Sequence, residues 1–176
     1  VCICTAGRRS PMAPSRFAQI ANAINKLPSP LRNRTLTAAV GRVIRFAGHA
    51  GIEVLQLEPG TVHLRLKNKR QVRNHIGGVH AAAMALLAES ASGYVLGLSL
   101  PAGKTPVIKS MEVNYRRRAQ GALEAVATLN QEERHLIESQ DSGELTVRVQ
   151  VTDERGDAPI ECRMLWAWRP DRKTTT

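Results

Sequence analysis

Residues 80–98 read HAAAMALLAESASGYVLGL. This stretch is rich in alanine and apolar nearly all the way round, which predicts a helix buried on every side rather than one lying at the surface. Small side chains recur along it and would let a sheet approach closely, at Ala81, Ala82, Ala83, Ala85, Ala88, Ala91 and Gly93. We therefore expect this helix to form the centre of the molecule.

Six segments with the alternation of β-strands flank this helix. Two precede it, at residues 52–57 and 61–67, and four follow it, at residues 106–117, 122–130, 144–152 and 160–168. In the clearest segment Leu145, Val147, Val149 and Val151 alternate with polar residues, which is the pattern of a half-buried strand. The predicted class is α+β, with a curved antiparallel sheet of about six strands wrapped around one long buried helix. Residues 131–143 are expected to form a polar loop.

Two further helices are predicted before the sheet. Residues 15–26 carry apolar side chains at helical spacing, with Ser15 as the N-cap, and a second helix is expected over residues 31–47. The chain then divides into four parts. These are a disordered tail (1–13), basic N-terminal helices (14–50), the sheet-and-helix domain (51–170) and a short C-terminal tail (171–176).

The net charge of +10 is concentrated in the N-terminal part of the chain. Residues 1–75 hold 13 Lys and Arg but only two acids, Glu53 and Glu58. An Arg-rich start without acids resembles an organellar transit peptide, whereas the alternative is a basic helical arm on a cytosolic protein. We expect a cytoplasmic protein, with a mitochondrial location as the alternative.

Composition narrows the classes of partner. Only six aromatic residues occur, two each of Phe, Trp and Tyr, so the side chains that stack on unpaired bases are nearly absent and no nucleic-acid partner is expected. No stretch approaches the roughly 20 apolar residues that span a bilayer, so no stable membrane insertion is expected.

Metal and disulfide sites are not expected either. The three cysteines, Cys2, Cys4 and Cys162, are an odd number and complete neither a disulfide framework nor a tetrahedral zinc site. His75, His80 and Glu89 lack the i,i+4 spacing of a helical ligand pair. We therefore expect an intracellular protein without a structural metal.

A candidate site lies where the central helix begins. Gly77 and Gly78 precede the helix and allow the backbone to pass close to a ligand. The unpaired amides of the first turn, at about residues 79–81, then point at that ligand with the positive end of the helix dipole behind them. Such amides suit the oxyanion that forms when a thioester carbonyl is attacked.

Glu89 is the second candidate, because it is the only acid between Glu58 and Glu112 and lies in an almost wholly apolar helix. Burial raises the pKa of a carboxyl toward the range of a useful base. The alternative is an acid that emerges at a helix end or pairs with an arginine. Ala81 and Glu89 are eight residues apart, or about 12 Å along a helix. If both act on one substrate they must come from different subunits, which predicts a dimer.

These residues resemble a known family. The pattern Asn74-His75-x-Gly77-Gly78-x-His80, followed by Leu87-Ala88-Glu89, is similar to the signature of hotdog-fold acyl-CoA thioesterases of the phenylacetate-degradation type. Residues 113–119 (VNYRRRA) and 121–123 (GAL) resemble later strands of that family. Residues 27–34 (LPSPLRNR) also resemble an uncharacterised hotdog family assigned to the thioesterases. The resemblance covers about residues 28–168 and implies a hotdog thioesterase-like domain over residues 51–170.

The resemblance implies a role for each candidate residue. Glu89 would be the general base or nucleophile, the Ala81 amide would polarise the thioester oxygen, Asn74 would orient water or the carbonyl, and His80 would shape the loop. The acid and the amide would come from neighbouring subunits of a homodimer or homotetramer. Gly77 and Gly78 would border the substrate. The candidates for binding the CoA phosphates are Arg116, Arg117 and Arg118.

The implied activity is hydrolysis of an acyl-CoA thioester to free acid and CoA, without a cofactor other than the CoA of the substrate. The alternative is a non-catalytic hotdog protein that binds acyl-CoA or lipid. For the three arginines the alternative is a solvated basic strand end. The sequence departs from the family where Ala81 and Ala82 replace glycines and Arg118 replaces a proline. The two alanines narrow the approach to the oxyanion site, and Glu89 is a glutamate where the family more often has an aspartate.

Overall fold

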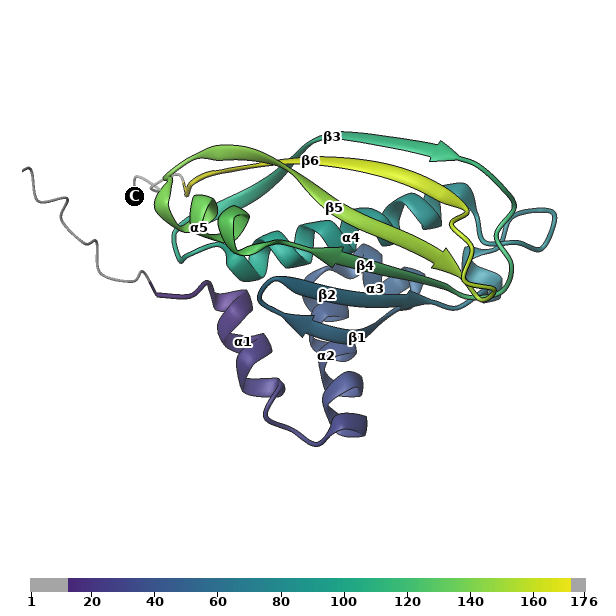
Figure 1. Ribbon diagram of the computed structural model, residues 1–176. Helices are drawn as coiled ribbons and strands as arrows, with labels where there is room; N and C mark the ends of the chain where they lie inside the picture. Colours follow the sequence, from purple (N-terminus) through teal and green to yellow (C-terminus); the bar gives the residue numbers. More distant parts are fainter. Residues whose placement is uncertain (1–12, 172–176) are drawn as a thin grey trace, which may run out of the picture.

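Helix α4 (Ala81–Ser99) runs through the middle of the molecule, and a curved six-stranded sheet wraps around it (Figure 1). The computed structural model describes residues 13–171. The two predicted tails therefore lie almost wholly outside the described residues. Twelve of the 19 residues of α4 are buried, which confirms the central helix that its composition predicts.

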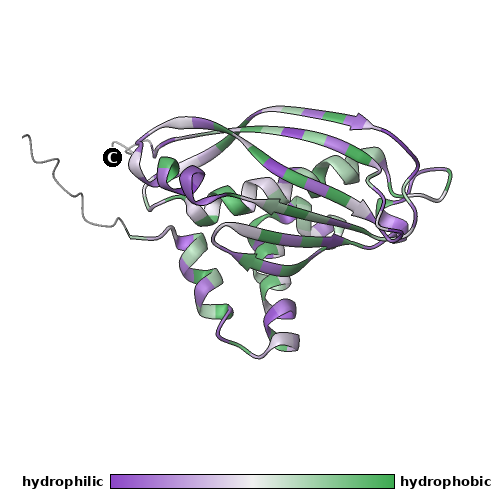
Figure 2. Cartoon of the chain, in the orientation of Figure 1, coloured by the Kyte–Doolittle hydropathy of each residue, from purple (hydrophilic) through white to green (hydrophobic). Residues whose placement is uncertain are grey.

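The sheet is antiparallel throughout, with the strand order β1-β2-β4-β5-β6-β3. Its strands are β1 (Ile52–Glu58), β2 (Thr61–Leu66), β3 (Lys104–Tyr115), β4 (Leu123–Thr128), β5 (Gly143–Asp153) and β6 (Ile160–Pro170). All six predicted strands are confirmed, with ends shifted by at most a few residues. Hydrophilic and hydrophobic residues alternate along β5 and β6 (Figure 2). The α+β class and the hotdog fold are thus confirmed, with β1 and β3 at the two edges of the sheet.

Three helices precede the sheet: α1 (Arg16–Ile24), α2 (Ser29–Val43) and α3 (Arg45–Ala50). The Ser15 side chain accepts a hydrogen bond from the Ala18 amide, as its predicted N-cap role requires. The single helix expected over residues 31–47 is wrong, because the chain leaves helical geometry at Ile44 (φ −109°, ψ 79°). At this break Gly41 and Gly48 meet so closely that a β-carbon on Gly48 would lie 2.6 Å from the Gly41 carbonyl oxygen.

The loop expected over residues 131–143 is also wrong, because helix α5 (Gln131–Ser139) forms there. Asn130 and Glu133 form a capping box, in which each side chain accepts a hydrogen bond from the other residue's amide. The far end of α5 is closed by Lys104, whose Nζ donates to the carbonyl oxygens of Ile137 and Gln140. A short polar helix is stable here because tertiary contacts satisfy both of its ends.

Trp166 of β6 packs directly onto Gly93 of α4. A β-carbon on Gly93 would lie 2.7 Å from the ring of Trp166, whose Nε1 donates to the Ser92 hydroxyl at 3.0 Å. The absence of a side chain at Gly93 therefore lets β6 lie directly against α4. By length and hydropathy α4 could cross a membrane, contrary to expectation, but most of it is buried inside the fold as a core helix is.

The contact between Gly93 and Trp166 gives a stability prediction. We expect Gly93→Ala to lower the free energy of unfolding by about 1–2 kcal/mol, because overpacking costs about 1–3 kcal/mol and the better helix propensity of alanine returns up to about 1 kcal/mol. Gly97→Ala is the matched control on the same helix, since its β-carbon would meet Phe17 at an ordinary 3.6 Å. Chemical denaturation should show the control to be as stable as wild type or more so. Equal stability of the two variants would contradict the prediction.

Candidate active site

A tight loop stands immediately before α4, and Asn74 closes it. The Asn74 Oδ1 accepts hydrogen bonds from the amides of Ile76 (3.1 Å) and Gly78 (3.0 Å), and the Asn74 amide donates to the Gly78 carbonyl. Gly77 has a φ of 79°, a conformation that favours glycine. Asn74 is therefore a turn residue whose side-chain oxygen is occupied. Its side-chain nitrogen, Nδ2, is the atom that remains to contact a substrate.

His80 caps the helix and leaves one amide available. Its Nδ1 accepts a hydrogen bond from the Ala82 amide at 3.1 Å, which requires a neutral ring with the proton on Nε2. Its own amide donates to the Val72 carbonyl at 2.8 Å. Within residues 13–171 the amide of Ala81, an exposed residue, has no hydrogen-bond acceptor. Of the first-turn amides expected to be unpaired, this one is therefore free to polarise an anion, with the helix dipole behind it.

The end of β3 holds this region in place. The Tyr115 hydroxyl donates to the Ala81 carbonyl at 2.9 Å, and the Arg118 guanidinium donates to the Ile76 carbonyl at 2.7 Å. Arg118 therefore braces the loop that Asn74 closes. Arg116 and Arg117 lie on the surface and pair with Glu161 and Asp157. Binding of CoA phosphates by these arginines stays a prediction and would require them to exchange their present partners.

Glu89 lies half-buried in the middle of α4. Burial raises the pKa of its carboxyl, and a weak hydrogen bond donated by the Ser90 hydroxyl at 3.4 Å opposes that rise. Within the described part of the chain no Lys, Arg or His forms an ion pair with it, so pairing with an arginine is not what the structure shows. A partly desolvated carboxyl without a counter-charge is suited to accept a proton at neutral pH.

Tyr94 is a neighbour of Glu89 that the sequence analysis did not single out. The residue is only 4 % exposed, and its hydroxyl is the one buried side-chain polar atom of residues 13–171 without a hydrogen-bond partner. Burial raises the pKa of Tyr94 to about 12, an interaction with the Ser90 side chain opposes that rise, and the nearby charge of Glu89 adds to it. A tyrosine five residues after an acid on a helix gives no recognisable spacing signal, so only the packing reveals it.

One chain does not bring the acid and the amide together. Helix α4 is continuous from Ala81 to Ser99, so Ala81 and Glu89 are held about 12 Å apart along its axis. Each chain thus carries two separate halves of the expected site. Asn74, Gly77, Gly78, Ala81 and His80 cluster at the helix start, and Glu89 lies two turns further along.

The edge strand β3 leaves one side of the sheet without a partner strand among residues 13–171. It is 12 residues long and pairs on one side with β6, while its other edge faces away from the sheet of this chain. Val107, Met111 and Tyr115 are large apolar side chains exposed along it. A long edge strand with exposed apolar residues is a template for pairing with another strand.

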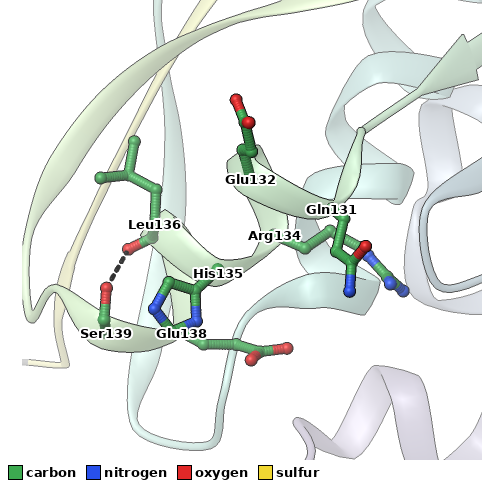
Figure 3. Close-up of a pocket in the computed structure, with 7 residues that line it drawn as sticks. All are labelled: Gln131, Glu132, Arg134, His135, Leu136, Glu138 and Ser139. Carbon is green, nitrogen blue, oxygen red and sulfur yellow. Dashed lines mark hydrogen bonds between the residues drawn. The ribbon is translucent and has the colours of Figure 1, made fainter.

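Other parts of the described surface do not bring reactive or metal-binding side chains together. An open hollow of about 580 Å³ lies over α5, but its seven lining residues all belong to that one helix and their side chains spread apart (Figure 3). Among residues 13–171 no group of three or more His, Cys, Asp or Glu side chains is placed to hold a metal ion. The start of α4 and Glu89 remain the strongest candidates.

The sequence and the fold were compared with known proteins. A family model described as a domain of unknown function (DUF4442) matches residues 32–168. A Pseudomonas aeruginosa protein of unknown function, described as a probable thioesterase, is 31 % identical with a TM-score of 0.70, and the match covers 82 % of this chain and 97 % of that one. A search of proteins with curated functions found no match.

More distant structures share the fold. A thioesterase from Haemophilus influenzae is 18 % identical with a TM-score of 0.61, and the match covers 74 % of this chain and 87 % of that one. A thioesterase family protein from Silicibacter pomeroyi is 15 % identical with a TM-score of 0.60, and the match covers 76 % and 96 % of the two chains. At these identities the likeness establishes the architecture alone.

The raised pKa of Glu89 predicts a gain in stability when its charge is removed. The folded protein holds the Glu89 proton more tightly than the unfolded chain does, so the stabilising effect of that proton is present below the ordinary pKa of 4.5 and lost as the pH rises through the raised value. We therefore expect Glu89→Gln to unfold at a higher temperature than wild type at pH 7. The difference should shrink as the pH falls toward 4.5. Thermal unfolding followed by circular dichroism measures both. A variant less stable than wild type at pH 7 would show that the carboxylate is compensated in the folded protein.

Proposed function

The chain belongs to the family described as a domain of unknown function (DUF4442), and we propose that it hydrolyses an acyl-CoA thioester to the free acid and CoA. The observation that carries the proposal is the half-buried Glu89 without a counter-charge on the central helix of a hotdog fold. The relation to a Pseudomonas aeruginosa protein described as a probable thioesterase supports thioester hydrolysis as the kind of reaction.

In the proposed mechanism Glu89 of one subunit acts on a carbonyl held at the start of α4 of the other. As a general base Glu89 removes a proton from water, and the resulting hydroxide attacks the thioester carbon. The negative charge that develops on the carbonyl oxygen is stabilised by the Ala81 amide and the helix dipole. The C–S bond then breaks, and the CoA thiolate takes the proton back from Glu89. As a nucleophile Glu89 would instead form an anhydride that water hydrolyses.

Two observations support a dimeric site. The first is the separation of about 12 Å between Ala81 and Glu89, which a glutamate side chain cannot close. The second is the open edge of β3, whose end also contacts the helix start through Tyr115. Pairing of two β3 strands would bring the α4 helices of both subunits under one continuous sheet. Dimerisation would shield Glu89 further from water and would therefore raise its pKa further.

A non-catalytic acyl-CoA or lipid binder is the second candidate, and the helix start favours it. His80 occupies the Ala82 amide, so a single donor, at Ala81, is left for an oxyanion. Ala81 also stands where the related thioesterases carry a glycine. A binder of this kind would be stabilised by acyl-CoA without releasing CoA, and Glu89→Gln would leave that binding unchanged.

Release of CoA thiol from short, medium, long and aromatic acyl-CoAs tests hydrolysis directly. We expect turnover on at least one class and a loss of about 10²–10⁴-fold in kcat in Glu89→Ala and Glu89→Gln, which is the contribution of a general base. The rate of the wild type should fall as the pH drops through the raised pKa of Glu89, because the protonated carboxyl cannot accept a proton. No turnover by a folded oligomer, or full turnover in both variants, would refute the proposed reaction.

Complementation between subunits tests the shared site. Ala81→Pro removes the amide proton at the first helical position, where proline is tolerated, and His80 already has the extended geometry (φ −64°, ψ 141°) that a following proline needs. The variant should lose about 10²–10³-fold in kcat, as expected for a missing oxyanion donor. A heterodimer of Ala81→Pro and Glu89→Ala chains, purified through two different tags, should regain roughly half of the wild-type rate, since one of its two sites is intact.

The matched control is a heterodimer in which one chain is wild type and the other carries both substitutions. Each of its sites then has one defective group if the groups come from different subunits, so it should be nearly inactive. It should instead retain half of the rate if each chain supplies both groups of its own site. Activity in this control and none in the complementing pair would place both groups on one chain.

A further inference from the structure

The N-terminal helices carry the most exposed apolar side chains of the described chain. Val43 and Phe46 are 70 % and 71 % exposed, more than any other large hydrophobic residue of residues 13–171. They flank Ile44, where the chain turns from α2 into α3. Ile20 on α1 and Leu31 at the start of α2 are about half exposed. A stable monomer gains nothing by leaving such side chains in water, so a concentration of them marks a contact surface.

Cations without ion-pair partners lie among these side chains. Residues 14–50 contain no acid and six cations, Arg16, Lys26, Arg32, Arg34, Arg42 and Arg45. None of the six forms an ion pair within the described residues. Arg42 and Arg45 immediately precede Val43 and Phe46, and all four side chains are exposed. We refer to these four residues as the α2–α3 corner.

The placement of the helices makes this surface accessible. α1 and α2 project away from the sheet side by side, on the side of the molecule opposite β3 and β6 (Figure 1). An apolar groove of about 60 Å³ runs between them, and Ile20 and Val43 are among its lining residues. Apolar surface is therefore continuous from α1 to the α2–α3 corner, and β3, the edge proposed for dimerisation, is left clear.

The charge of the α2–α3 corner and the size of the adjoining groove favour lipid over protein as the partner of this surface. A second copy of this chain would bring the same unpaired cations against each other across a two-fold axis, which is unfavourable. The groove between α1 and α2 is small, at about 60 Å³, so it offers a partner protein little room to insert a side chain. Anionic lipid headgroups match the cations, and the boundary between headgroups and acyl chains takes up shallow apolar side chains such as Val43 and Phe46.

We propose that the α2–α3 corner docks the protein on an anionic lipid surface. Arg42 and Arg45 contact the headgroups, while Val43 and Phe46 enter the boundary of the acyl region and the helices lie in the plane of the membrane without crossing it. The buried helix α4 takes no part in this contact. Docking is independent of the proposed reaction, since its residues are outside the candidate active site.

Co-sedimentation of the full chain with vesicles tests the docking without any substrate. We expect binding to vesicles of phosphatidylcholine with about one-third phosphatidylserine, and weak binding to phosphatidylcholine alone. Binding should weaken as the salt concentration rises from 0.1 M to 0.5 M, because the Debye length then falls from about 10 Å to about 4 Å and the attraction of the arginines to the headgroups is screened. Val43→Ser/Phe46→Ser and Arg42→Gln/Arg45→Gln should each weaken binding about tenfold or more.

Val126→Ser/Arg163→Gln is the matched control, because it replaces one exposed apolar and one exposed basic side chain on the sheet. It should bind as wild type does. Equal binding to both vesicle types, or no effect of either corner variant, would overturn the proposal. A smaller particle mass of Val43→Ser/Phe46→Ser in light scattering would show that the corner joins copies of the chain instead. Vesicle binding lost in the arginine variant but kept in the serine variant would overturn the insertion of Val43 and Phe46 into the acyl boundary, because charge alone would then account for the binding.

Discussion

The rest of the structure depends on the need to cover α4 on every side. A helix that is apolar nearly all round cannot lie at a surface without exposing a hydrophobic face to water. The curved sheet covers one side of it, and α1 and α3 contact the other, where the rings of Phe17 and Tyr94 meet edge to face at 5.8 Å. Small residues allow this packing, and at Gly93 the Trp166 ring leaves no room for a β-carbon.

The same burial gives Glu89 its chemical character. A carboxylate in the middle of an otherwise apolar helix loses solvation, and within the described residues no cation compensates it. The protein thereby gives up stability at neutral pH at the position where a base would be useful. The nearby Tyr94 hydroxyl is buried without a hydrogen-bond partner. Buried polar groups without partners are uncommon in folded proteins, and the one found among residues 13–171 lies near Glu89.

The N-terminal helices have two faces with different roles. Their inner faces bury Ala18, Ala21, Leu36 and Val40 and complete the enclosure of the core. Their outer faces carry cations and exposed apolar side chains that the fold of one chain does not use. The break at Ile44 is what concentrates these side chains, because it turns the chain between Val43 and Phe46 instead of continuing the α2 axis.

The sequence by itself determined the class, the six strands and the central helix, because these follow from the period of apolar residues, which local geometry imposes. It also singled out Glu89 and the loop before α4, since an isolated acid and a glycine pair stand out from their surroundings. Features that rest on contacts between distant residues became visible only in the folded chain. The α2–α3 break depends on Gly41 meeting Gly48, and α5 depends on Lys104 closing its end. Asn74 and Arg118 were found to hold the loop, and Tyr94 to lie unpartnered near Glu89, because side-chain direction and burial are set by packing and not by spacing along the chain.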